Sequence, residues 1–337
     1  MKTREEIKAL SFAERVEIEN EVLELIKNND LEGVKNFLKD YTCEISCYEV
    51  CFKDEKGEDP RRFEEEELGG DYPLLEPFYF ILEAAYSCGE HNNNFSILDY
   101  LFNEYGLSLK DPKYNFSHRN IKYIKEINEK YILLEPEEEE YYVYDEALIY
   151  KYLEDADNPN PEIVKYLVNK GARFDVYQKR YYTETPLHFW ARWNEYRLLE
   201  VAIKGGANVD MPILRGEYSD TLLFAAVSES ENYRTTQLLI DLGANVNYAM
   251  PSTPLDVAKG TRNKKLLKEA GAMTSEQIER KFKLPKYDSS HCKVDGKNDY
   301  DLLGKYHDEY SKLLNDAIKG AKENPKNTQS SNKKNKK

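Results

Sequence analysis

Apolar residues recur at helical spacing along most of the chain. Between residues 160 and 272 they form short runs three and four positions apart, such as Ile163, Val164 and Leu167, and each run is followed by a Gly-Ala pair. Residues at this spacing share one face of an α-helix, so the runs predict helices with one buried side. A glycine fits the end of such a helix, because the residue there often adopts the left-handed conformation that glycine takes most easily.

The predicted helix ends repeat along the sequence. The segments "VNKGARFD", "IKGGANVD", "IDLGANVN" and "LKEAGAM" place their glycines at positions 171, 206, 243 and 271, in steps of 35, 37 and 28 residues. Such a period is typical of a helix-turn-helix unit with loops of variable length. Upstream of two units, Thr185-Pro186 and Thr253-Pro254 provide a capping side chain and a proline at the first helical position.

These motifs resemble the ankyrin repeat. Thr185-Pro186-Leu187-His188 is similar to its opening motif, and Gly-Ala-Asn-Val-Asp is similar to its close. The resemblance is specific over 160–272 and loose over 16–111, and about six units can be counted. It implies an all-α, ankyrin-type helical-repeat solenoid, in which each pair of antiparallel helices is followed by an outward finger. Leu222 in place of proline, Phe224 in place of histidine and Trp190 in place of a small residue depart from the family pattern and predict locally distorted stacking.

The pattern divides the chain into five segments. Between residues 40 and 150 the only periodic patterns are helical. Ser11 with Glu14 is expected to form a capping box at the first helix. An amphipathic helix from about Tyr300 to Lys322 is expected to cap the last repeat, because a terminal repeat otherwise exposes its stacking face. The segments are degenerate helix-pair repeats at 1–111 with an acidic loop at 53–73, an acidic insertion at 112–143, ankyrin repeats at 144–272, a loop and C-terminal helix at 273–323, and a disordered basic tail at 324–337.

Charge and composition restrict the class of partner. The formal net charge is -14, and the acidic body makes nucleic acid an improbable partner, because it repels phosphate. No apolar run reaches membrane-spanning length and the N-terminus lacks a secretory signal, so a soluble, cytoplasmic protein is expected. Five cysteines also favour a reducing compartment. Delivery by a secretion route that needs no signal stays open, since it leaves no trace in a sequence.

Candidate chemistry is sparse. His188, near Glu184, is interpreted as a structural residue that hydrogen-bonds the neighbouring turn, as the resemblance implies, rather than as a general base. Cys43, Cys47 and Cys51 would share a helix stripe, and Cys88 with His91 could complete a metal site, but buried cysteines show the same spacing. The acidic runs at 64–67 and 137–140 are interpreted as solvated. No catalytic residue, cofactor or metal is therefore assigned.

The resemblance implies that a protein partner lies along the concave face and the finger tips. Aromatic residues, methionine and arginine are enriched where binding energy concentrates. The predicted partner-binding residues are Tyr177, Arg180, Tyr181, Tyr182, Trp193, Arg215, Tyr218, Tyr248 and Met250.

The expected function is that of a monomeric, non-enzymatic scaffold for protein–protein interaction. One alternative is an effector or toxin-like protein with an enzymatic module in its N-terminal half, which would require a sheet-containing domain with a pocket between residues 40 and 150. Another is a structural subunit that self-associates through its terminal helix.

Overall fold

The computed structural model describes residues 12–40, 77–116, 124–135, 147–179, 183–214, 219–290, 292–294, 297–298 and 300–323. The chain forms two compact units. Unit 1 comprises Met1–Gln178 with Lys204–Gly206, and unit 2 comprises Lys179–Ile203 with Ala207–Lys337. Ser11, the acidic segment at 53–73 and the tail at 324–337 lie outside the described residues. None of the helices in the described ranges is long and apolar enough to cross a bilayer.

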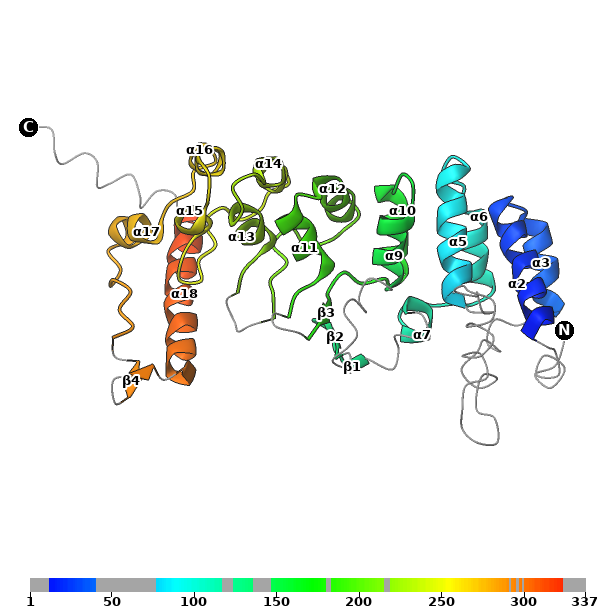
Figure 1. Cartoon of the computed structure of the whole chain (residues 1–337), viewed down its shortest axis with the longest axis horizontal. Helices are drawn as coiled ribbons and strands as arrows, with labels where there is room; N and C mark the ends of the chain where they lie inside the picture. The colour runs from blue at the N-terminus through cyan, green and yellow to red at the C-terminus, as the bar shows by residue number, and fades with distance from the viewer. Residues whose placement is uncertain are drawn as a thin grey trace, which may run out of the picture. The chain divides into compact units, whose positions relative to one another are not determined.

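Unit 1 is built mainly from paired helices (Figure 1). Helix α5 packs against both α2 and α9, and buried Val22, Ile26, Phe78 and Ile81 contribute to the core of the unit. The helices are α2 (Phe12–Lys27), α3 (Leu31–Asp40), α5 (Pro77–Glu90), α6 (Ser96–Asp99) with the π-helix η2 (Tyr100–Glu104), α7 (Pro112–Asn115), α9 (Leu148–Asp155) and α10 (Pro161–Lys170).

The glycine after α10 ends the helix as predicted. Asn160 caps the start of α10 by accepting a hydrogen bond from the Glu162 amide, with Oδ1 2.9 Å from N. At the other end Gly171 has a φ of 115°, in the left-handed region. A Cβ atom there would lie 2.9 Å from the backbone nitrogen of Lys110. Glycine is therefore required both by the backbone conformation and by the close approach of another segment.

The predicted helical-repeat class is confirmed, since the described elements are mainly helices, but a small sheet in unit 1 corrects the expectation of helical structure alone at 40–150. Strands β1 (Ile124–Ile127) and β2 (Ile132–Leu134) pair antiparallel, and β2 pairs in parallel with β3 (Val176–Gln178), with Ile132 opposite Val176. These strands have three or four residues each, so they carry too little periodic pattern to be predicted. The parallel pairing also joins segments that are distant in sequence.

Unit 2 holds the segments with the clearest repeat motif. Their first helices are α11 (Pro186–Trp193), α13 (Leu222–Val227) and α15 (Pro254–Val257), and their second helices are α12 (Tyr196–Lys204), α14 (Tyr233–Asp241) and α16 (Thr261–Glu269). Helix α11 packs on α13, and α13 packs on α15. Trp190 and Leu222, at positions that depart from the family pattern, are both buried in this stack. Bulkier residues at these positions therefore fill the core of the unit.

The C-terminal helix α18 (Tyr300–Glu323) has the range that the sequence predicts. It follows α17 (Ser275–Phe282) and the short hairpin of β4 (Lys293–Val294) and β5 (Lys297–Asn298). Buried Tyr310, Leu314 and Ile318 pack with Ala249 and Ile278 in one apolar cluster. The helix thus covers apolar surface that the preceding repeats leave, which is the role expected of a cap.

Candidate functional site

His188 joins the start of α11 to the next finger. Its Nδ1 accepts hydrogen bonds from the backbone nitrogen and from Oγ1 of Thr185, at 3.3 and 3.0 Å. Its Nε2 lies 3.0 Å from the carbonyl oxygen of Met211, and because a carbonyl only accepts, Nε2 carries the proton. Burial lowers the pKa of His188 to about 4. The predicted hydrogen bond to the neighbouring turn is confirmed. The buried, neutral ring links Thr185 to the carbonyl group of Met211.

Glu184, the residue that could have made His188 a general base, is engaged elsewhere. Its buried carboxylate accepts two hydrogen bonds from Arg192, at 2.6 and 3.2 Å. Such a bidentate pair fixes the orientation of the guanidinium. The guanidinium carbon of Arg192 also lies 5.8 Å from the ring centre of Phe189. Glu184 therefore acts as an anchor for a cation–π contact.

Trp193 is the exposed member of this group. Its side chain is 62% exposed, and its ring centre lies 5.6 Å from that of Phe189. We call Phe189, Arg192 and Trp193 the Trp193 cluster. The cluster presents a large aromatic surface to solvent at the end of α11, and its Arg192 is held by a partly buried ion pair with Glu184.

In the next repeat, the position equivalent to His188 makes a different contact. Phe224 stands where α11 has His188, and it packs edge to face on Tyr248 with ring centres 6.5 Å apart. Thr221, the residue that precedes α13, is buried, and its Oγ1 has no hydrogen-bond partner. A hydrophobic contact has replaced the histidine clamp in this repeat, and it leaves one buried hydroxyl unsatisfied.

The structure places the predicted partner-binding residues in three environments. Tyr177 is only 2% exposed, because it lies in β3 with its ring edge-on to Tyr131, so it is not presented to a partner as predicted. Trp193 is exposed, whereas Tyr248 and Met250 are partly buried. The remaining predicted residues lie outside the described residues: Arg180, Tyr181, Tyr182, Arg215 and Tyr218.

The cysteine and histidine residues considered for a metal site lie in different surroundings. Cys88 is buried in α5, and burial raises the pKa of its thiol to about 11. His91 is exposed, with its Nε2 2.9 Å from the carbonyl oxygen of Lys27. Cys43, Cys47 and Cys51 lie outside the described residues. Within the described ranges, no group of three His, Cys, Asp or Glu side chains is arranged to hold a metal ion.

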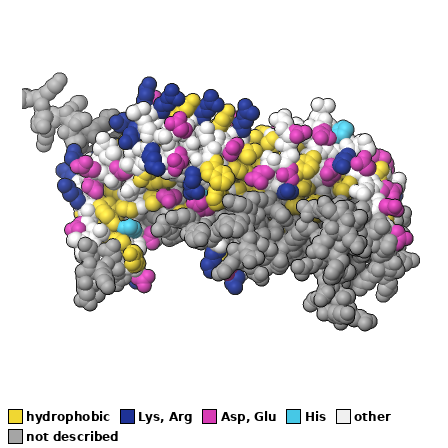
Figure 2. Space-filling view, in the orientation of Figure 1, with side chains coloured by type: hydrophobic (Ala, Val, Ile, Leu, Met, Phe, Trp, Pro, Cys, Tyr) yellow, Lys and Arg dark blue, Asp and Glu magenta, His cyan; other side chains and the backbone are white. Residues whose placement is uncertain are grey.

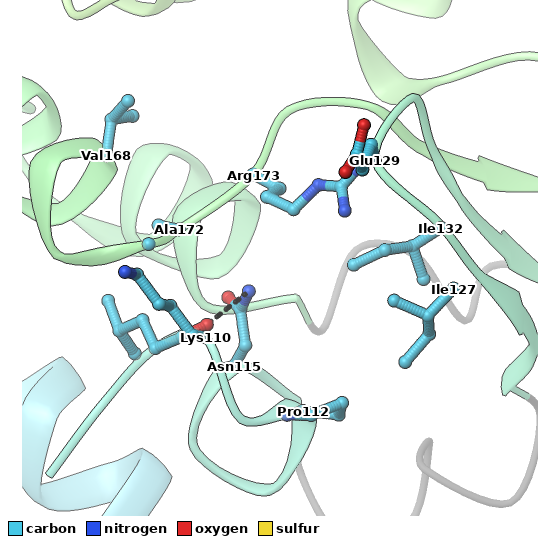
Figure 3. A pocket seen from close by; sticks show the side chains of 11 residues that line it. Lys110, Pro112, Asn115, Ile127, Glu129, Ile132, Val168, Ala172 and Arg173 are labelled. Atoms are coloured by element: carbon cyan, nitrogen blue, oxygen red, sulfur yellow. Dashed lines mark hydrogen bonds between the residues drawn. The ribbon is translucent and has the colours of Figure 1, made fainter.

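A pocket of about 400 Å³ lies in unit 1 next to the small sheet. Figure 3 shows side chains from three segments around it. Arg173 donates to both carboxylate oxygens of Asp175, at 2.8 and 2.6 Å, and to the carbonyl of Asn128 at 2.6 Å. The lining residues are Leu109, Lys110, Pro112, Asn115, Ile127, Glu129, Ile132, Val168, Gly171, Ala172 and Arg173.

The chemistry of this pocket is limited. Its lining contains no serine, threonine, cysteine, histidine or aspartate, and its ionisable side chains are those of Lys110, Glu129 and Arg173. The amide oxygen of Asn115 lacks a hydrogen-bond partner, but it is buried and does not reach solvent. The pocket could not be predicted from the sequence, because its lining depends on the pairing of β2 with a strand more than forty residues later.

Paired helices with Thr-Pro openings, left-handed glycine ends and a covering C-terminal helix define a helical-repeat protein. Residues 154–250 match the family model described as ankyrin repeats (3 copies). This segment therefore consists of ankyrin repeats. Such repeats are generally protein-interaction modules.

Among solved structures, the crystal structure of the human ASB11 ankyrin repeat domain is similar to this chain, with 14% sequence identity and a TM-score of 0.34. The alignment covers 87% of this chain and 96% of that one. Among curated proteins, none matches the chain in sequence.

Proposed function

We propose that this protein is a cytoplasmic, non-enzymatic scaffold that binds another protein through its first helices and finger tips, centred on the Trp193 cluster. The observation that carries the proposal is the exposure of Trp193 on supporting residues that are already fixed. Its neighbour Arg192 is held by buried Glu184. A partner that covers the indole ring would gain apolar contact area with little loss of side-chain freedom, because the support is ordered beforehand.

We propose that the fingers of unit 2 extend this surface. Tyr248 and Met250 belong to a finger of the same unit and retain partial exposure. The finger residues Arg180, Tyr181, Tyr182, Arg215 and Tyr218 are proposed as further contacts from the sequence. We also propose that two helix pairs, α2 with α3 and α5 with the contiguous α6 and η2, are divergent copies of the same repeat. In each pair one helix follows the other directly in the chain, and Gly106 follows the second pair with a φ of 94°.

A pull-down from lysate of the source organism tests the Trp193 cluster. Trp193→Ala is compared with Tyr300→Ala, which removes an aromatic side chain that is 79% exposed on α18 of the same unit. We expect wild type and Tyr300→Ala to retain the same protein and Trp193→Ala to lose it, with all three unfolding at similar urea concentrations. Equal retention by the Trp193→Ala variant would exclude the cluster as the site.

The alternative, an effector with an activity in its N-terminal half, draws on the small sheet and the pocket of unit 1. A sheet-containing domain with a pocket between residues 40 and 150 is the feature expected to distinguish this alternative from the scaffold. However, the sheet has only three short strands, and the pocket lining has no serine, cysteine or histidine from which a paired nucleophile and base could be built. The scaffold is therefore the better supported function.

A further inference from the structure

The second helices of unit 2 share a feature that the ankyrin motif does not require. Arg197, Arg234 and Arg262 each occupy the second position of their helix, in α12, α14 and α16. They are separated by 37 and 28 residues, the same steps that separate the glycines at 206, 243 and 271. The repeat unit therefore places one arginine at an equivalent point of each helix. We call these three residues the arginine row.

Each step of the row is joined by a tyrosine. Tyr196 and Tyr233 occupy the first positions of α12 and α14. The guanidinium carbon of Arg234 lies 5.8 Å from the ring centre of Tyr196, and that of Arg262 lies 4.7 Å from the ring centre of Tyr233. Every arginine after the first thus lies over the tyrosine of the preceding repeat. Hydrogen bonds from Arg197 and the charge of Arg234 lower the pKa of Tyr196, which fits this proximity.

Helix stability does not explain the row. The N-terminal turn of a helix carries partial positive charge and favours acidic residues. None of the first turns of α12, α14 and α16 contains an acidic residue, and each contains an arginine instead. The arginines are therefore placed where they oppose the helix dipole, while their side chains remain exposed.

The row lies on a basic edge of an acidic protein. Helix α16 adds exposed Lys264, Lys265 and Lys268 to Arg262, with Glu269 as its single acidic residue. Figure 2 shows Lys and Arg side chains gathered along the edge that carries α12, α14 and α16. The chain as a whole has a net charge of -14. This local excess of positive charge is complementary to a negatively charged ligand.

We propose that the arginine row is a second binding surface, and that its ligand is an acidic polypeptide segment of a partner protein. A guanidinium stacked on a ring keeps its N–H groups at the edge, where a carboxylate can accept two of them. Packed helices lie about 8–10 Å apart. Three residues of an extended chain span roughly 10 Å. A segment with an acidic residue at every third position would therefore offer one carboxylate to each helix.

The same geometry disfavours a nucleic acid. Single strands bind by stacking their bases on exposed aromatic rings. Here Arg234 and Arg262 already occupy one face of the rings of Tyr196 and Tyr233. The net negative charge of the chain also repels phosphate at long range. An acidic polypeptide carries fewer charges per unit length than a nucleic acid, and its carboxylates bind without stacking on an aromatic ring.

The test measures binding of a fluorescent peptide to the full-length chain. The peptide has about twelve residues, with Glu at every third position among Gly and Ser. A matching peptide with Gln in place of Glu controls for charge. The test variant combines Arg197→Gln, Arg234→Gln and Arg262→Gln. The matched control combines Lys305→Gln, Lys312→Gln and Lys319→Gln, three exposed residues of α18, and removes the same charge from the same unit.

We expect the Glu peptide to bind wild type and the α18 control with affinities within about twofold of each other, and the arginine variant at least about tenfold more weakly. A third variant with lysine at all three positions is expected to be weakened as well, because lysine cannot make the bidentate contact. Circular dichroism and urea unfolding verify that each variant is folded.

Three outcomes would overturn the proposal: equal loss in the α18 control, no difference between the Glu and Gln peptides, or tighter binding of a single-stranded oligonucleotide of the same length. The arginine row does not depend on the Trp193 cluster. A protein that is lost from Trp193→Ala and retained by the arginine variant would show that the two surfaces act separately.

Discussion

Thr221 and Thr253 occupy the same position, directly before a first helix, but their hydroxyl groups have different surroundings. Oγ1 of Thr253 lies 3.0 Å from Asp256 Oδ2 and 2.8 Å from the carbonyl oxygen of Met273. Oγ1 of Thr221 is buried without a partner. We expect Thr221→Val to raise the free energy of unfolding by about 1 kcal/mol, because it removes an unsatisfied hydroxyl. Thr253→Val should lower it by about 2 kcal/mol.

Urea unfolding followed by circular dichroism compares the two variants with wild type. Since the substitution is identical, differences in β-branching and volume cancel between them. A loss of stability in Thr221→Val as large as that in Thr253→Val would show that the Thr221 hydroxyl has a partner in solution.

His188 makes stability depend on pH. Its pKa is about 4 in the folded chain, against 6.5 for an ordinary histidine. Between these values the unfolded chain binds more protons at this position, so the stability contributed by neutral His188 is present above pH 6.5 and is lost as the pH falls toward 4. The full loss corresponds to about 3 kcal/mol. We expect His188→Gln to be less stable than wild type at pH 7, and the difference to shrink toward pH 4.

The control for this prediction is the shape of the pH profile. Titrating carboxylates affect both proteins equally, so the difference between the two free energies of unfolding isolates His188. A difference that stays constant from pH 7 to pH 4 would mean that His188 remains accessible to protons in the folded chain.

At the scale of elements, one side chain of helix α18 adds a pair of hydrogen bonds to the apolar cluster that holds this helix. Asn315 donates to the carbonyl oxygen of Ala249 at 2.8 Å and accepts from its amide at 3.1 Å. Loss of this side chain would leave both backbone groups in partly buried surroundings. We expect Asn315→Ala to lower the free energy of unfolding by about 2 kcal/mol. Lys312→Ala, on an exposed position of the same helix, should change it by less than about 0.5 kcal/mol.

Helices could be predicted where the apolar pattern and the capping residues lie within one continuous segment. The range of α18, the left-handed glycine after α10 and the proline at the start of α11 follow from local pattern and capping chemistry. Strands β1 to β3 were not, because their pairing joins distant segments. The burial of Tyr177 is a consequence of that pairing. The sequence does contain a signal for the arginine row, since the glycine steps applied to Arg197 lead to Arg234 and Arg262.

At the scale of the whole molecule, the fold provides repeated positions, and the residues placed on them determine which partners fit. The first helix α11 carries the Trp193 cluster, whereas the second helices carry the arginine row. The net charge of -14 therefore describes neither surface, because one surface is aromatic and the other is basic. Salt should weaken binding at the arginine row much more than at the Trp193 cluster, because exposed charges are screened and apolar contacts are not.

The same distribution of side chains predicts the oligomeric state. Among the described residues, the exposed large apolar side chains are Ile127, Trp193, Val257, Tyr300 and Leu302, of which only Tyr300 and Leu302 are neighbours on one helix. Stable dimers usually bury a larger apolar patch, and a net charge of -14 opposes self-association. We expect light scattering at tens of micromolar to give the mass of one chain, 39.4 kDa. A dimer that Leu302→Glu dissociates would instead assign the start of α18 to self-association.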